Sequence, residues 1–160
     1  MRRLLSLALA ALVVVADQLS KSWVIAHFQD APAGIAQQPL LPVFNLVLTW
    51  NRGVSFGLFN QDSAWNVVLF SLLAAAIVVA LLVWLWRSAS PLVAAGIGFV
   101  IGGAIGNVID RLRLGAVTDF LDFHWAAWHF PAFNLADSCI TVGVALLVLD
   151  GLLGKRESLN

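Results

Sequence analysis

The feature that most constrains this chain is a set of four apolar stretches, at about residues 4–25, 65–86, 91–109 and 135–153. A helix of roughly 20 such residues crosses the hydrocarbon core of a membrane. The chain of 160 residues is 61% hydrophobic and 11% charged, whereas a soluble domain is about 25% charged. This pattern excludes an ordinary soluble globule and a disordered chain. It predicts an all-α membrane protein with four transmembrane helices in a single domain.

The charge and cysteine content exclude further classes. Nine Lys and Arg residues balance nine Asp and Glu residues, so we expect no nucleic-acid partner. One cysteine excludes an intrachain disulfide and a CxxC metal site. The first stretch is also compatible with a cleavable signal peptide, but its apolar character resumes after Asp17 and favours a retained helix.

Basic residues near the ends of the stretches predict the orientation in the membrane, because cytoplasmic loops carry more of them. One group falls on a single side, which we predict to be cytoplasmic together with both termini: Arg2, Arg3, Arg87, Lys155 and Arg156. The other group falls on the opposite side, where partners in the fold are expected to hold it: Lys21, Arg52, Arg111 and Arg113.

Two long connections, residues 27–63 and 110–134, then lie outside the cytoplasm. In the first, Phe44–Trp50 and Val54–Phe59 are predicted strands around a turn at Asn51-Arg52-Gly53, since Asn and Gly tolerate positive φ. We therefore expect a small extracytoplasmic β-sheet between the first and second helices. The second connection carries most of the remaining polar residues.

The third stretch has glycine at every fourth position, at Gly98, Gly102 and Gly106. Small residues at this spacing let two helices approach closely in lipid, which predicts a packing face. Asn107 and Arg111 share a face at the end of the same helix. Arg111 is expected to satisfy the last helix carbonyls or to hold the outer connection over a site.

Acidic residues at membrane depth need a reason, because each costs free energy there. Asp17 and Lys21 are four residues apart with the acid first, which favours an ion pair within one helix. Asp119 lies within the second outer connection and Asp137 opens the stretch that follows it, so both should lie near the same membrane surface. Each acid also has a purely structural interpretation. Asp137 could cap the last helix together with Asn134, and Asp119 could be a solvent-exposed acid of the connection.

If Asp119 and Asp137 meet, two adjacent carboxyl groups share a proton and can activate a water molecule. Asp137 is the expected ionised partner because a helix N-terminus favours negative charge. The residues alone leave open a proton-coupled transport subunit that uses Asp17 and Lys21, and a non-catalytic membrane scaffold. A zinc site is disfavoured because no HExxH pattern is present; its candidate ligands would be Asp119, Asp122, His124 and His129.

Five segments together resemble one family, the lipoprotein signal peptidases (signal peptidase II), which are bacterial membrane aspartic proteases. The resemblance covers nearly the whole chain. The segments are Asp17-Gln18-Leu19-Ser20-Lys21, Asn51-Arg52-Gly53-Val54-Ser55-Phe56, Gly102-Gly103-Ala104-Ile105-Gly106-Asn107-Val108-Ile109-Asp110-Arg111, Val117-Thr118-Asp119-Phe120 and Phe133-Asn134-Leu135-Ala136-Asp137.

This resemblance implies that Asp119 and Asp137 form a catalytic dyad. The dyad would cleave prolipoprotein signal peptides on the N-terminal side of a diacylglyceryl-modified cysteine, at the outer face of the bacterial inner membrane. It implies a monomer among membrane lipids, with no metal or other cofactor, and a lid-like element within residues 27–63. It further implies supporting or substrate-binding roles for Asp17, Lys21, Asn51, Gly53, Asn107, Arg111 and Asn134.

Overall fold

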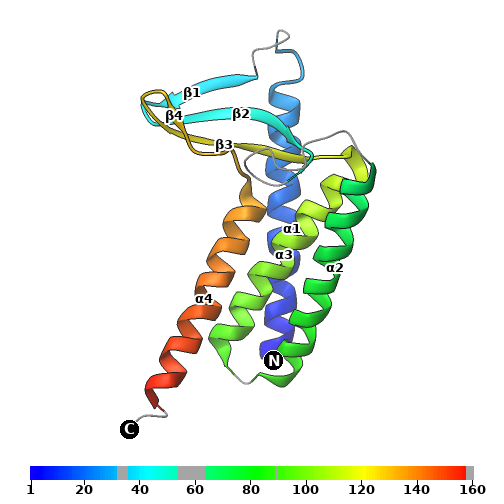
Figure 1. Cartoon of the computed structure of the whole chain (residues 1–160), viewed down its shortest axis with the longest axis vertical. Coiled ribbons are helices and arrows are strands. Elements are labelled where there is room, and N and C mark those ends of the chain that lie inside the picture. Colours follow the sequence, from blue (N-terminus) through cyan, green and yellow to red (C-terminus); the bar gives the residue numbers. More distant parts are fainter. Residues whose placement is uncertain (32–35, 54–63, 89, 158–160) are drawn as a thin grey trace.

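The computed structural model describes residues 1–31, 36–53, 64–88 and 90–157. The elements follow one another as α1 (Arg2–His27), β1 (Gln37–Leu41), β2 (Phe44–Asn51), α2 (Ala64–Arg87), α3 (Pro91–Leu114), β3 (Val117–Trp125), β4 (Trp128–His129) and α4 (Leu135–Glu157). The helices run alongside one another, and the strands lie across one end of them (Figure 1). Within the described ranges, four helices are long and apolar enough to cross a membrane, as the apolar stretches predict.

Helix α3 is the centre of the bundle, and α1, α2 and α4 all pack against it. Of its most apolar window, 67% is buried inside the protein, against 6% for α2. The predicted glycine face accounts for the close packing. A Cβ atom at Gly102 would lie 2.6 Å from the Cβ atom of Val13 in α1, so a larger residue would push these two helices apart.

Helix α3 continues beyond the apolar stretch at about residues 91–109. It begins after the Ser90 cap and ends at Leu114, and the following Gly115 adopts the left-handed conformation with φ 73°. Asp110 lies within the helix, where it is buried and paired with Lys21 of α1.

The four strands form one antiparallel sheet in the order β1-β2-β3-β4. The predicted strand at Phe44–Trp50 is confirmed as β2. Its hairpin partner is β1, at Gln37–Leu41, and its other neighbour is β3, from the second outer connection. The sheet is therefore not confined to the segment between the first two helices, and the all-α description is too narrow. The predicted strand Val54–Phe59 lies outside the described residues.

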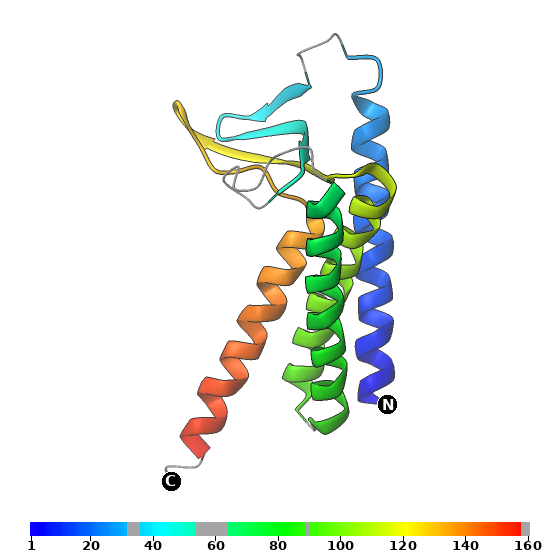
Figure 2. The same ribbon diagram turned by 45° about the vertical axis from the view of Figure 1, so that its right-hand side comes forward.

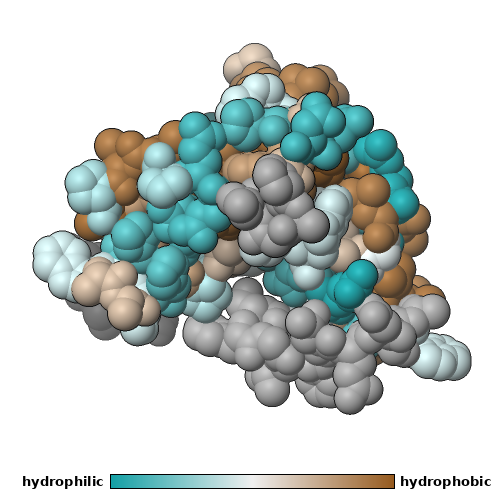
Figure 3. Space-filling model, turned by 90° about the horizontal axis from the view of Figure 1, so that it is seen from above, coloured by the Kyte–Doolittle hydropathy of each residue, from teal (hydrophilic) through white to brown (hydrophobic). Residues whose placement is uncertain are grey.

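A small apolar cluster joins the sheet to the bundle. Val24 and Phe28 at the end of α1 pack with Leu46 of β2 and Phe120 of β3. Figure 2 shows α4 diverging from the other helices away from the sheet, whereas its first turn lies directly below the strands. Viewed from the sheet end, hydrophilic side chains occupy much of the central face, and hydrophobic ones lie mostly toward the edges (Figure 3). The strands thus place polar groups above the start of α4.

Candidate active site

Asp119 and Asp137 come from different elements and meet at Asn134. Asp119 lies in β3, opposite Thr49 of β2, and Asp137 lies in the first turn of α4. The Nδ2 atom of Asn134 donates to Asp119 Oδ1 at 2.8 Å, and its backbone nitrogen donates to Asp137 Oδ2 at 3.2 Å. The structure therefore brings the two predicted acids to a single asparagine.

Asn134 also caps α4, as its spacing from Asp137 predicted. Its Oδ1 atom accepts a hydrogen bond from the backbone nitrogen of Asp137 at 3.0 Å, so each residue bonds the backbone of the other. This reciprocal pair satisfies two N–H groups that the start of a helix leaves without partners. The capping role and the placement of the acids are compatible, because the same cap fixes the position of Asp137.

Two further asparagines donate to the carboxyl groups. Asn51 Nδ2 lies 3.0 Å from Asp119 Oδ2, and the backbone nitrogen of Gly53 donates to Asn51 Oδ1 at 3.1 Å. Asn107 Nδ2 lies 2.8 Å from Asp137 Oδ1. Each of the four carboxyl oxygens thus accepts a hydrogen bond from an N–H group.

Asp119 is almost completely buried, with 3% of its surface exposed. Burial, followed by the nearby charge of Asp137, raises the pKa of Asp119 to about 6, although Asn51, Asn134 and Lys21 act in the opposite direction. A carboxyl group of this kind keeps its proton into the weakly acidic range. Two acids that share a proton can act together, one as a base and the other as an acid.

Below the acids lies a buried ion cluster. The predicted pair is confirmed, with Lys21 Nζ 2.9 Å from Asp17 Oδ2. Lys21 also lies 3.2 Å from Asp110 Oδ2 and donates to Asn107 Oδ1 at 3.0 Å. The sequence analysis did not assign a role to Asp110. Its spacing of three from Asn107, which places both on one face of α3, was the available signal.

Arg111 lies beside this cluster. Its Nη1 atom is 3.5 Å from the carbonyl oxygen of Asn107, a long contact within α3. Because α3 continues to Leu114, this carbonyl is not one of the last carbonyls that we expected Arg111 to satisfy. The guanidinium carbon lies 5.3 Å from the ring centroid of Phe70 in α2, so Arg111 links α3 to α2.

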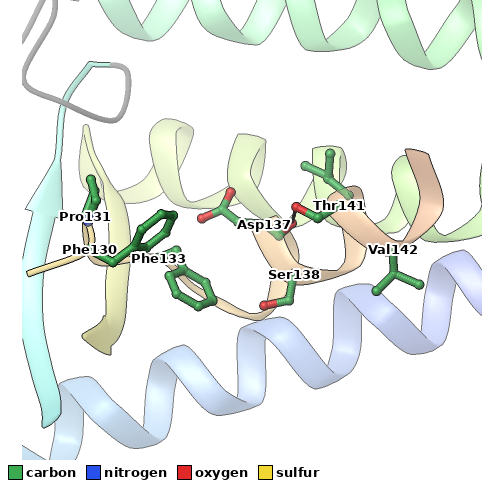
Figure 4. Close-up of a pocket in the computed structure, with 8 residues that line it drawn as sticks. Phe130, Pro131, Phe133, Asp137, Ser138, Thr141 and Val142 are labelled. Atoms are coloured by element: carbon green, nitrogen blue, oxygen red, sulfur yellow. Dashed lines mark hydrogen bonds between the residues drawn. The ribbon is translucent and has the colours of Figure 1, made fainter. Parts of the chain in front are cut away.

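An open groove of about 680 Å³ runs along Asp137. Figure 4 shows the Asp137 carboxyl group between the Phe130–Phe133 segment and the next turn of α4. Most of the lining is apolar, which suits a hydrophobic chain at membrane depth. The lining residues are Phe130, Pro131, Phe133, Asp137, Ser138, Ile140, Thr141 and Val142.

Three of the candidate zinc ligands, Asp119, Asp122 and His129, have hydrogen-bond partners within the protein. Asp122 accepts from Asn45 at 2.7 Å and lies 2.9 Å from His129 Nδ1. Burial acts to raise the pKa of Asp122, but these hydrogen bonds and the neighbouring histidines outweigh it and lower that pKa. In the part of the chain that the structure describes, no group of three or more His, Cys, Asp or Glu residues could hold a metal ion. Asp122 instead ties β2, β3 and β4 together.

Comparison with solved structures first defines the class of protein. One solved structure, described as a bacterial membrane enzyme at 2.3 Å resolution, matches with a TM-score of 0.79 and 28% identity over 95% of this chain and 90% of that chain. A second bacterial membrane enzyme, at 1.9 Å, matches with a TM-score of 0.76 and 29% identity over 92% of each chain. The fold is thus that of a bacterial membrane enzyme.

The sequence comparisons then identify the family. Residues 9–153 match the model of the signal peptidase (SPase) II family, and the chain belongs to this family. The lipoprotein signal peptidase of Shewanella loihica is 47% identical over 148 residues, which cover 91% of this chain and 85% of that protein. The lipoprotein signal peptidase of Yersinia enterocolitica is 42% identical over 151 residues, covering 93% and 87%. The resemblance read from the sequence is confirmed, and the chain is a membrane protease.

Proposed function

We propose that this protein is an aspartic endopeptidase that removes signal peptides from lipid-modified prolipoproteins. The observation that carries the proposal is the convergence of Asp119 and Asp137 on Asn134, with the pKa of Asp119 raised to about 6. The names of the relatives support the substrate class. Cleavage occurs on the N-terminal side of the diacylglyceryl-modified cysteine.

In the proposed mechanism, Asp137 is the ionised base and Asp119 the protonated acid. Asp137 takes a proton from a water molecule, whose oxygen attacks the scissile carbonyl carbon, and Asp119 gives its proton to the carbonyl oxygen. The tetrahedral intermediate then collapses as Asp137 passes its proton to the leaving amine, and Asp119 recovers a proton from the new hydroxyl group.

The other predicted residues support this chemistry. Asn51, Asn107 and Asn134 hold the two carboxyl groups through the hydrogen bonds described above, and Gly53 orients Asn51. Asp17 and Lys21 form a buried ion pair beneath the site, and Arg111 supplies a nearby positive charge. The reaction needs neither a metal nor another cofactor.

The proposed setting is the bacterial inner membrane, with both termini in the cytoplasm and the site on the outer side. A substrate with a signal helix and a lipid-bearing cysteine is confined to the bilayer, so an enzyme at the membrane interface can reach its cleavage site. The apolar groove beside Asp137, with a volume of about 680 Å³, has room for part of such a substrate. The protein acts as a monomer surrounded by membrane lipids.

The direct test is cleavage of a synthetic diacylglyceryl-modified peptide by purified protein in lipid bilayers. Asp119→Asn and Asp137→Asn should each lower kcat by about 1,000-fold or more, because each removes an acid–base group. Asp30→Asn, which changes an exposed carboxyl group, is the matched control and should retain full activity. Thermal unfolding shows whether each variant is folded.

Three results would count against the proposal. Full cleavage by a folded Asp119→Asn or Asp137→Asn variant would remove that residue from the mechanism. Loss of wild-type activity with a metal chelator would favour a metal-dependent reaction instead. A folded wild-type protein that cleaves no lipidated peptide would favour the transport or scaffold alternative.

A further inference from the structure

The ammonium group of Lys21 uses all of its hydrogen-bonding capacity inside the protein. An ammonium group has three N–H donors and no acceptor. Lys21 Nζ lies 2.9 Å from Asp17 Oδ2, 3.2 Å from Asp110 Oδ2 and 3.0 Å from Asn107 Oδ1. Only 2% of its surface is exposed. The three acceptors come from α1 and α3, and each leads onward to the acids of the proposed dyad.

The first two connections reach the backbone beside each acid. The second carboxyl oxygen of Asp17 accepts from the backbone nitrogen of Ala136 at 3.0 Å, and Ala136 directly precedes Asp137. Asp110 Oδ2 accepts from the backbone nitrogen of Thr118 at 2.9 Å, and Thr118 directly precedes Asp119. One cation therefore holds the two carboxylates that fix the start of α4 and the start of β3.

The third connection reaches the side chain of Asp137. Because Lys21 can only donate, Asn107 must turn its oxygen toward the ammonium group, and its nitrogen then faces Asp137 Oδ1 at 2.8 Å. The same Asn107 oxygen accepts from Asn134 Nδ2 at 3.2 Å. With Lys21 absent, the Asn107 oxygen would lose its charged donor and keep only the Asn134 amide.

We propose that Lys21 is a positioning residue that aligns Asp119 and Asp137 through these three connections. This role rests on the proposed function of the two acids. A buried ion cluster is a poor source of stability, because the cost of taking charges out of water offsets much of their attraction. Its benefit is geometric, since it sets the spacing and direction of groups contributed by α1, α3, β3 and α4.

The charges around Asp119 make the role measurable. Asp119 faces the negative charge of Asp137 from α4 and the positive charge of Lys21 from α1. Arg111 of α3 interacts with both acids and with Asp110, and Asp17 pairs with Lys21. Removal of the Lys21 charge therefore changes the titration of Asp119 as well as its position.

The experiment compares Lys21→Met with a double variant, Asp17→Asn with Lys21→Met. The double variant removes the partner charge as well, and the amide oxygen at position 17 can still accept from Ala136. For each, kcat on a lipidated peptide should fall about 100-fold, the loss expected when reacting groups are misplaced, while KM changes less than about 3-fold.

Ser6→Ala is the matched control, because it removes a different buried α1–α3 contact, between Ser6 Oγ and the Ala94 carbonyl. It should lower thermal stability and leave kcat within about 2-fold of wild type.

A second readout does not depend on activity. Carboxyl carbon NMR of protein labelled at aspartate, assigned with Asp119→Asn, should show the titration midpoint of Asp119 at higher pH in Lys21→Met than in wild type. Ser6→Ala should leave that midpoint unchanged. A purely structural role for Lys21 would lower stability without moving the midpoint.

The inference is overturned if the folded double variant keeps wild-type kcat, or if folded Lys21→Met keeps the wild-type midpoint of Asp119. It is also overturned if the double variant does not fold, since Lys21 would then serve the fold rather than the acids. Failure of the proposed function gives a different result, because the wild-type protein itself would not cleave the peptide while the titration shift would remain.

Discussion

At the scale of single residues, asparagine amides determine the surroundings of the two acids. Asn51 and Asn134 each have an amide oxygen that accepts from a backbone nitrogen, of Gly53 and Asp137 respectively. Their amide nitrogens consequently face Asp119. These bonds favour a negative charge on Asp119, whereas burial and Asp137 oppose it and dominate. The balance raises the pKa of Asp119 to about 6, so this carboxyl group holds its proton below about that pH.

This balance predicts the pH dependence of cleavage. Because the pKa of Asp119 is raised to about 6, the pair keeps its shared proton below that pH and loses it as the pH rises. The value of kcat/KM should therefore fall above about pH 6, since loss of the proton removes the general acid. The measurement is kcat/KM for a lipidated peptide between pH 4.5 and 8.5. A flat profile across that range would show that the titration of Asp119 does not control the reaction.

Some contacts of the candidate site could be predicted from the sequence, and others could not. Spacing predicted the Asp17–Lys21 pair and the Asn134 cap, because both are local contacts within about four positions along the chain. The meeting of Asp119 with Asp137 depends on how β3 and α4 join, and from the residues alone it stayed one alternative among several. Asp110 was not assigned a role because its partners Lys21 and Thr118 lie on other elements.

At the scale of elements, close contact between α3 and α4 holds the site together. A Cβ atom at Gly103 would meet the backbone oxygen of Ala136, one residue before Asp137, and would lie 2.7 Å from a side-chain carbon of Ile140. A backbone oxygen cannot rotate away as a side chain does. The distance between the two helices therefore controls the position of Asp137.

We expect Gly103→Ala to destabilise the protein by about 1–3 kcal/mol, as overpacking usually does, and to lower kcat as α4 moves outward. Gly151→Ala is the matched control, because a Cβ atom there would meet nothing within 4 Å. It should stabilise α4 by up to about 1 kcal/mol through helix propensity and leave kcat unchanged. Thermal unfolding and steady-state kinetics in lipid bilayers provide both measurements. Equal effects of the two substitutions would contradict the packing argument.

Helices were easier to predict than strands for a physical reason. A membrane-spanning helix satisfies its own backbone hydrogen bonds, so its apolar length alone identifies it. Strand β3 has no such local signature, because its buried residues include Thr118, Asp119 and Asp122. These polar groups are satisfied by partners far along the chain, such as Asn45 and Asn51 in β2. The sequence analysis therefore treated this segment as a connection.

At the scale of the whole molecule, the arrangement of charges predicts a sidedness that can be measured. The sheet and the α2–α3 connection lie at opposite ends of the bundle (Figure 1). In the proposed orientation, the sheet is outside and the connection is in the cytoplasm. The basic residues Arg3 and Arg87 lie at the end of the bundle that this orientation places in the cytoplasm, and there Arg3 donates to the carbonyl oxygen of Trp86 at 2.7 Å.

Thiol labelling tests this sidedness. In a Cys139→Ala background, which removes the single cysteine of the chain, Gln37→Cys in β1 should react with a membrane-impermeant maleimide on intact spheroplasts. Ser88→Cys, between α2 and α3, should react only after the membrane is disrupted. The reverse pattern would invert the proposed orientation.

The position of Asp137 at the start of the last helix has a consequence for biosynthesis. A growing chain carries Asp119 before Asn134 and Asp137 have been made, so the first acid is without the cap and the second acid that complete the pair. Because ribosomes build proteins from the N-terminus, the proposed protease is inactive until α4 joins the bundle. Truncated products in the membrane would therefore be harmless to neighbouring proteins, with no separate inhibitor required.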